Sequence, residues 1–313
     1  MKKIALVILL MTGFILNTVA CINNVTELED GTVITNDNIY YDVPYGHVFL
    51  KDKFPSALKR MDNLWKATNN IEYYSDYGLI LILQGKYEEA KKVYIDIEKL
   101  KPGRYETASN LGTVYELLGN NKNALKWIKK AIGLYAKSHD DSEWLHAKIL
   151  EAKIKGDAFI TSDFLLNTNF GIDTIPQSKL TENELKKLKA TLVYQLNERM
   201  TFIKPENKIM ALLLFDLGNV LALLESQANA AAVYDLANEY GYSDSLLGIR
   251  LDYFTHEQTT VSTVQPDCTM VISKSAVPII PATETHYTLF LILEVCVCIL
   301  LIGAFFFFKR KRN

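Results

Sequence analysis

A pattern of small residues recurs every 34 residues between residues 71 and 138, and this period limits the fold more than any other feature of the sequence. The first copy comprises Gly78, Gly85, Ala90, Tyr94 and Pro102. The second copy comprises Gly112, Gly119, Ala124, Ile128 and Ala136. A third copy, which starts near Ala211, comprises Leu217, Gly218, Ala230, Tyr234 and Ala237. A fixed period of this length is typical of stacked supersecondary units that bury their apolar faces against their neighbours.

The small residues predict that each unit is a pair of antiparallel helices that approach each other closely. On the first helix, the close approach is expected at Gly78, Gly112 and Gly218. On the second helix, the residues expected to face these glycines are Ala90, Ala124 and Ala230. Gly85 and Gly119 fall in the turns, and Lys101-Pro102-Gly103 breaks the chain after the first unit.

These spacings resemble those of tetratricopeptide (TPR) repeats, and the chain resembles uncharacterised TPR proteins of bacterial envelopes. The resemblance covers most of residues 71–244, with repeats at 71–104, 105–138 and 211–244 and an insertion at 139–210. It implies an all-α, TPR-type helical-repeat solenoid over residues 55–254 that binds other proteins. Unrelated helices in a generic bundle would need the same small residues to recur at one period by chance.

The insertion is predicted to contain two helices with a loop between them. A helix over residues 144–155 is indicated by an apolar stripe formed by Trp144, Ala147, Leu150 and Ile154. Residues 156–178 are rich in Asp, Asn, Thr and Gly and are predicted to be a loop. Thr181 and Glu184 have the spacing of a capping box, so a long helix is expected to begin there. Its buried face is predicted to consist of Leu185, Leu188, Leu192 and Leu196.

Capping helices are expected on both sides of the repeats, because the apolar face of a terminal unit would otherwise meet water. One would cover residues 55–66, with its inward side chains being Leu58, Met61 and Leu64 or Trp65. The other would cover residues 243–254. Residues 21–54 show no helical period, and apart from the β-leaning residues 32–35 this segment has no assignment.

The N-terminus has the three regions of a secretory signal peptide over residues 1–20: Lys2 and Lys3, an uncharged run, and small residues up to Ala20. The body is therefore expected to be exported. Cys21 leaves two interpretations open. The sequence before it resembles a bacterial lipobox, with Thr18 where the motif has Leu, so Cys21 is either lipidated or left as a thiol by ordinary cleavage.

The C-terminus is predicted to anchor the chain in a membrane. Residues 287–308 are mostly apolar and, at about 1.5 Å per residue, long enough to cross a hydrocarbon core of about 30 Å. The basic residues of the tail, 309–313, are expected to stay in the cytoplasm, which places the body on the extracytoplasmic side. Residues 255–286 are rich in Thr, Ser, Val and Pro and are expected to be a tether. Glu294 is either a helix-partner or protonation site, or an acid that the surrounding apolar residues tolerate.

Charge and cysteine content exclude several functions. The sequence has 34 Lys plus Arg against 36 Asp plus Glu, interspersed along the chain, so nucleic acid is not an expected partner. The four cysteines lie outside the helical body and have neither the pairing of a disulfide framework nor the spacing of a zinc site: Cys21, Cys268, Cys296 and Cys298.

The TPR resemblance implies a concave partner groove lined by the first helix of each repeat. In the first repeat the groove positions are Glu72, Ser75, Leu79, Ile82 and Leu83. In the second they are Glu106, Ser109, Thr113, Glu116 and Leu117, and in the third Leu212, Phe215, Asn219, Ala222 and Leu223. Chaperone-binding members of the family hold a terminal carboxylate with Lys, Asn and Arg, whereas these residues are mostly Glu, Ser and apolar. An apolar or basic segment of a protein partner is therefore expected.

The sequence lacks P-loop, GxSxG, HExxH and GxGxxG motifs, and we expect no catalytic, cofactor-binding or metal-binding residues. The strongest metal candidate is the group of His139, Asp140, Asp141, Glu143 and His146. A di-iron bundle needs the Glu-x-x-His pair twice, so the carboxylates are interpreted as caps and dipole partners of a helix that begins at Asp141 or Ser142.

The preferred hypothesis is a membrane-anchored scaffold or adaptor whose groove binds a protein. One alternative is a metal-binding or enzymatic envelope protein that uses residues 139–178. The other is a purely structural envelope protein in which the groove faces pack on the N-terminal segment or the insertion.

Overall fold

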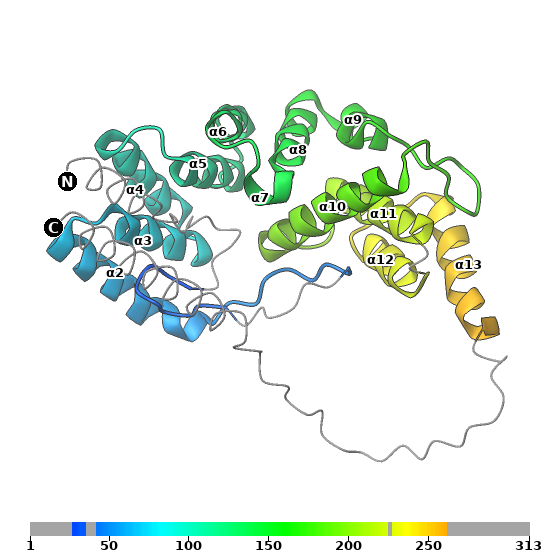
Figure 1. Ribbon diagram of the computed structural model, residues 1–313, viewed down its shortest axis with the longest axis horizontal. Coiled ribbons are helices and arrows are strands. Elements are labelled where there is room, and N and C mark those ends of the chain that lie inside the picture. Colours follow the sequence, from blue (N-terminus) through cyan, green and yellow to red (C-terminus); the bar gives the residue numbers. More distant parts are fainter. Residues whose placement is uncertain (1–26, 36–41, 225–226, 262–313) are drawn as a thin grey trace, which may run out of the picture. The chain divides into compact units, whose positions relative to one another are not determined.

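The helical pairs that the 34-residue period predicts are present in the computed structural model, which describes residues 27–35, 42–224 and 227–261 (Figure 1). These residues lie in the first of two compact units, Met1–Val264. They form an all-α helical-repeat fold, with two isolated antiparallel bridges, Glu27 to Val33 and Thr35 to Phe49. The predicted signal peptide, Cys21, the membrane span with Glu294 and the basic tail lie outside the described residues. Within the described ranges, no helix has the length and apolar character needed to cross a membrane.

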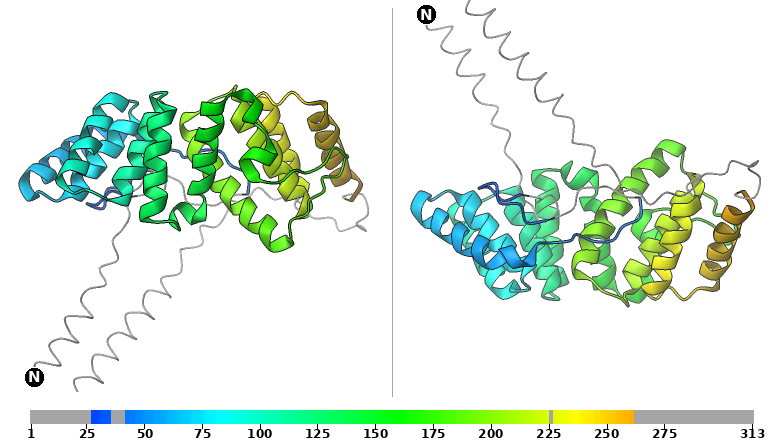
Figure 2. Two further views of the ribbon diagram at one scale, coloured as in Figure 1. Left: turned by 90° about the horizontal axis from the view of Figure 1, so that it is seen from above. Right: turned by 90° about the horizontal axis from the view of Figure 1, so that it is seen from below.

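Each pair consists of two consecutive helices, and a tight turn joins the helices in the first two pairs. The first two pairs are α3 (Ile71–Leu83) with α4 (Tyr87–Leu100), and α5 (Tyr105–Leu117) with α6 (Asn121–Leu134). The third pair is α11 (Lys208–Leu223) with α12 (Gln227–Glu239). Gly85 and Gly119 occupy turns with φ of 75° and 76°, a left-handed conformation that glycine adopts without a Cβ clash. Figure 2 shows the helices following one another in chain order, from α2 in blue to α13 in gold.

A large side chain fills the close approach within each pair. A Cβ atom on Gly78 would lie 2.9 Å from the Tyr94 ring, and Ile128 and Tyr234 block the same space at the other two glycines, Gly112 and Gly218. The alanines expected to face the glycines are buried, but they are not the groups nearest to them: Ala90, Ala124 and Ala230. The prediction was wrong in this detail, because the glycine makes room for a larger residue one helical turn further along the second helix.

The insertion contributes helices that connect the second pair to the third. They are α7 (Ser138–Asp141), α8 (Glu143–Lys155), η3 (Asp157–Phe159), α9 (Ser162–Leu166) and α10 (Glu182–Phe202). The capping box between Thr181 and Glu184 is present at the start of α10, and the four predicted leucines are buried. η3 and α9 lie where the sequence predicts only loop. The Thr161 hydroxyl oxygen accepts from the Phe164 N–H and starts α9 over a run too short to show a helical period.

α8 buries two faces, which corrects the single stripe predicted for it. One face packs beside α6 through Ala147 and Leu150. The other face joins the core shared with α10 and α11 through Leu145, Ile149 and Ala152. Trp144 and Ile154 were predicted to point inward, but they are 39% and 38% exposed. A one-sided pattern fails here because the helix has neighbours on two sides.

Helices α2 (Phe54–Thr68) and α13 (Ser245–Val261) flank the pairs. Met61 of α2 is buried as predicted, and Leu58 and Leu64 pack against the same core. α13 continues past residue 254 to Val261, because residues 255–261 contain no glycine or proline to end it. The first residues of the predicted tether therefore belong to the helix. Ahead of α2 and the short turn η2 (Lys51–Lys53), residues 27–35 pack on α3.

Candidate functional site

The predicted groove residues lie on the first helices α3, α5 and α11, and many of them are buried within the chain. The buried ones are Ser75, Leu79, Ile82, Ser109, Leu212, Phe215 and Asn219. The partly accessible ones are Glu72, Leu83, Glu106, Thr113, Leu117, Ala222 and Leu223, whereas the Glu116 side chain is only 7% exposed. A partner of this face would contact the second group, and binding there stays a prediction.

Residues 27–35 cover part of α3. Leu28 and Ile34 are buried in the same core as Leu79 and Ile82. The face of α3 that was predicted to line the groove therefore shares its core with a segment that the sequence left without an assignment.

Arg104 forms ion pairs with Glu72 of the first repeat and Glu106 of the second. Its Nη2 atom lies 2.5 Å from Glu72 Oε2, and its Nε atom lies 3.5 Å from Glu106 Oε2. The Arg104 side chain is buried, whereas both carboxylates stay partly accessible. This arrangement neutralises part of the acidic character that the sequence predicts for the groove.

Glu116 is held by cations from the insertion. Its Oε1 atom accepts from Lys153 of α8 at 2.6 Å and from Arg199 of α10 at 2.8 Å, and its Oε2 atom lies 2.6 Å from His146 Nε2. Burial opposes ionisation of Glu116, but Arg199, His146 and Lys153 outweigh it and hold its pKa well below the usual range. Glu116 therefore joins α5 to the insertion, a role that its groove position does not reveal.

Arg250 of α13 is fully buried and holds α11 to the loop that precedes α10. Its Nη1 atom donates to Asn219 Oδ1 at 2.6 Å, and the Tyr234 hydroxyl donates to the same oxygen at 2.8 Å. Its other nitrogens donate, at 2.9 to 3.1 Å, to the carbonyl oxygens of Phe170, Gly171 and Asp173. The predicted groove residue Asn219 is thus an internal acceptor. Nothing in the sequence near Arg250 indicated this role.

A buried polar residue recurs at one position of the three pairs: Asp76, Asn110 and Asp216. Burial raises the pKa of Asp76 to about 7, although the Glu29 N–H donates to its Oδ2 atom at 2.7 Å. Burial likewise raises the pKa of Asp216 to about 7, against the opposing effects of nearby hydrogen bonds and of Arg250. Asn110 is neutral and donates to the Tyr94 hydroxyl at 2.9 Å. These residues were not among the predicted site residues, although the 34-residue alignment places them at one position.

Glu143 lies between two imidazoles. His139 Nδ1 contacts Glu143 Oε2, and His146 Nδ1 lies 3.7 Å from Glu143 Oε1. Burial raises the pKa of Glu143, but hydrogen bonds to His139 and His146 outweigh this effect and lower it. The arrangement is a buried network of one carboxylate and two imidazoles at the start of α8.

α8 begins with Ser142 as its N-cap residue and has Glu143 in its first turn, as predicted, but the predicted side-chain cap is absent. The Ser142 side chain makes no capping hydrogen bond, and its oxygen instead accepts from Gln195 of α10 at 3.0 Å. In the part of the chain that the structure describes, no three His, Cys, Asp or Glu side chains are grouped so that they could hold a metal ion.

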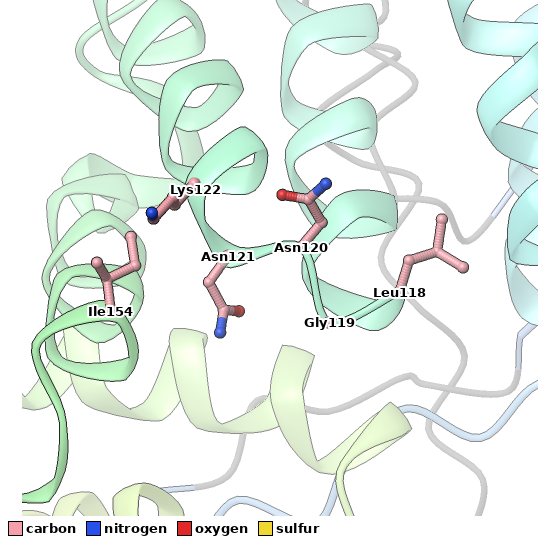
Figure 3. Close-up of a pocket in the computed structure, with 6 residues that line it drawn as sticks. All are labelled: Leu118, Gly119, Asn120, Asn121, Lys122 and Ile154. Atoms are coloured by element: carbon pink, nitrogen blue, oxygen red, sulfur yellow. The ribbon is translucent and has the colours of Figure 1, made fainter.

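A surface pocket of about 490 Å³ lies where the turn between α5 and α6 meets the end of α8 (Figure 3). Its lining consists of Leu118, Gly119, Asn120, Asn121, Lys122 and Ile154. Asn120 is used as a cap, because its Oδ1 atom accepts from the Asn123 N–H. The lining holds one cation and no carboxylate or imidazole, so it offers no acid–base pair for catalysis.

Residues 71–104 and 105–138 match the family model described as Tetratricopeptide repeat. No curated protein was found to match the sequence. Among solved structures, the chain is similar to a tetratricopeptide repeat protein from Parabacteroides merdae, with 14% sequence identity and a TM-score of 0.33 over 66% of this chain and 93% of that chain. The third pair lies outside the matched residues and stays a prediction as a repeat of this family. The two matched tetratricopeptide repeats are therefore the pairs α3–α4 and α5–α6.

Proposed function

We propose that the chain is a membrane-anchored scaffold or adaptor that binds a protein partner on the extracytoplasmic side. The observation that carries the proposal is the pair of matched repeats, because tetratricopeptide repeats generally mediate binding between proteins. The anchor and its orientation rest on the apolar residues 287–308 and the basic tail that follows them.

The accessible positions on α3 and α5 indicate the kind of partner. Leu83 and Leu117 are partly exposed apolar side chains at equivalent positions of the two matched repeats. Thr113 on α5 is also partly exposed. Glu106 keeps an accessible carboxylate although it pairs with Arg104. This combination supports an apolar segment with flanking basic residues as the ligand.

Affinity capture from membranes tests this proposal with the full-length chain. A partner of the accessible face should be lost from both Leu83→Arg and Leu117→Arg, because a buried cation would oppose docking of an apolar segment. The matched control is Leu100→Arg, at a position on α4 that is 61% exposed and outside the groove. Equal capture by wild type and both groove variants, with helical circular dichroism unchanged, would contradict the proposed contact.

Membrane extraction tests the anchor separately. The full-length chain should resist extraction by alkaline carbonate, and protease added outside intact cells or spheroplasts should digest the body. Release by carbonate, or protection of the body from external protease, would contradict the anchor or its orientation. Replacement of Cys21 by serine should abolish incorporation of labelled lipid if that residue is acylated, and leave the C-terminal anchor intact.

The packing of residues 27–35 on α3 supports the structural alternative, in which the N-terminal segment itself fills part of the groove. Crosslinking from the accessible groove positions distinguishes the two. Products containing only this chain favour the structural protein, and a second protein lost in Leu83→Arg favours the scaffold.

A further inference from the structure

Residues 42–50 are here called the strap, and residues 42–47 of it lie along α10, a helix that is distant from them in sequence (Figures 1 and 2). The backbone N–H groups of Tyr45 and Gly46 both donate to Asn197 Oδ1, at 3.0 and 3.2 Å. The N–H of His47 donates to Thr201 Oγ1 at 3.0 Å. Two side chains of α10 thus accept three consecutive backbone donors. Such contacts recognise the backbone of a segment whatever its side chains.

Two side chains and one glycine of the strap set its register. Asp42 Oδ1 lies 2.9 Å from Lys189 Nζ. His47 Nε2 lies 2.8 Å from Glu198 Oε1. Between them, Gly46 has a φ of 83°, and a Cβ atom there would lie 3.0 Å from the Met200 carbonyl carbon. α10 therefore requires a glycine at this point.

The strap and α10 run in the same direction with matched lengths. From Lys189 to Thr201 the helix rises about 18 Å at about 1.5 Å per residue. From Asp42 to His47 an extended chain covers about 17 Å at about 3.3 Å per residue. The two lengths therefore match, although Gly46 itself, with a φ of 83°, is not extended.

The strap is attached by these polar contacts and by three apolar residues: Pro44 is buried, and Val43 and Phe49 are partly buried against the two main cores. Gly46 is also buried, but Tyr45 and Val48 are 44% and 54% exposed. A segment held by few buried apolar side chains opens at lower free energy than the core does. The strap is thus suited to exchange with another segment of similar chemistry.

From this geometry we infer that the α10 face formed by Lys189, Asn197, Glu198 and Thr201 is a binding surface for extended peptide segments, and that the strap is its built-in occupant. The partner segment carries an acid, a glycine four residues later, and a basic or imidazole side chain directly after that glycine. The partner displaces the strap when it binds. The inference deepens the proposed scaffold function but concerns α10, so its test is independent of the groove on α3 and α5.

The test uses a fluorescent peptide with the sequence of residues 42–50 and the full-length chain. The variant Gly46→Ala weakens the chain's own strap, because the added Cβ atom meets the α10 backbone. The peptide should bind this variant at least about tenfold more tightly than wild type, because the internal competitor no longer occupies the site. Adding Asn197→Ala to Gly46→Ala should abolish the binding. Adding Lys187→Ala, an exposed position on α10, should leave it unchanged.

A peptide with alanine in place of its glycine is the matched ligand control and should not bind. Should Gly46→Ala lose its helical circular dichroism, His47→Ala releases the strap without a backbone clash and takes its place. Equal affinity of wild type and the release variant, no binding to either, or binding insensitive to Asn197→Ala would overturn the inference. A release variant that forms dimers by exchanging straps, seen as a doubled mass, would overturn the assignment to a separate partner.

Discussion

Replacing Asp216 by asparagine should stabilise the chain at pH 8 and have little effect at pH 4. In the folded chain, burial raises the pKa of Asp216 from 3.8 to about 7, so the folded state binds this proton more tightly than the unfolded state. The wild type therefore loses stability as the pH rises from the ordinary carboxyl range to about 7. At about 1.36 kcal/mol per pH unit, the interval from 3.8 to about 7 corresponds to about 4 kcal/mol.

Asparagine removes this penalty because its amide does not ionise. The equivalent position of the second repeat already holds the amide of Asn110, so the fold accommodates it. Urea unfolding of the full-length wild type and Asp216→Asn, followed by circular dichroism at pH 4, 6 and 8, measures the effect. The advantage of the variant should grow by about 4 kcal/mol between pH 4 and pH 8, with most of the gain below pH 7.

The control is Asp235→Asn, at an exposed position of α12, which should show no comparable trend. An advantage of Asp216→Asn that is the same at every pH would mean that the carboxylate is not penalised by burial. In that case the reasoning about this recurring position would fail.

Four further changes test the packing. Gly112→Ala should destabilise the chain by about 1 to 3 kcal/mol in thermal unfolding, because Ile128 occupies the space. Gly133→Ala, where no atom lies within 4 Å, should instead stabilise it by up to about 1 kcal/mol. Glu116→Gln should cost about 3 to 5 kcal/mol at pH 7 by leaving Arg199 without its carboxylate. Because the pKa of Glu116 is lowered, that cost should shrink as the pH falls below the ordinary carboxyl range. Arg250→Met should lower the free energy of unfolding by at least about 3 kcal/mol and make the loop after residue 169 sensitive to protease. Unchanged cleavage would show that Arg250 does not hold this loop in place.

The regular elements were predictable because their signals are local. Gly78 and Gly112 lie 34 residues apart, and each marks a first helix that packs closely against the second helix of its pair. Thr181 and Glu184 specify the start of α10 within four residues of sequence, and the capping box forms there.

The site was less predictable because its contacts are distant in sequence. Glu116 pairs with Arg199, and His47 pairs with Glu198, across intervals that no periodicity covers. The strap has no repeating pattern, because its register is set by acceptors on another helix rather than by its own apolar residues. The prediction that Trp144 is buried was wrong for a related reason, since the neighbours of α8 on two sides decide which of its residues are buried.

The two buried faces of α8 bear on how the chain unfolds. In a stack of repeats, each unit is stabilised by its neighbours, and cooperativity is set by the interfaces between them. α8 packs beside α6 on one side and shares a core with α10 and α11 on the other. If either the matched repeats or the third pair unfolds, one buried face of α8 becomes exposed, and the packing of α8 on the other is weakened. The insertion therefore couples the unfolding of the matched repeats to that of the third pair, and the two should melt together as one unit.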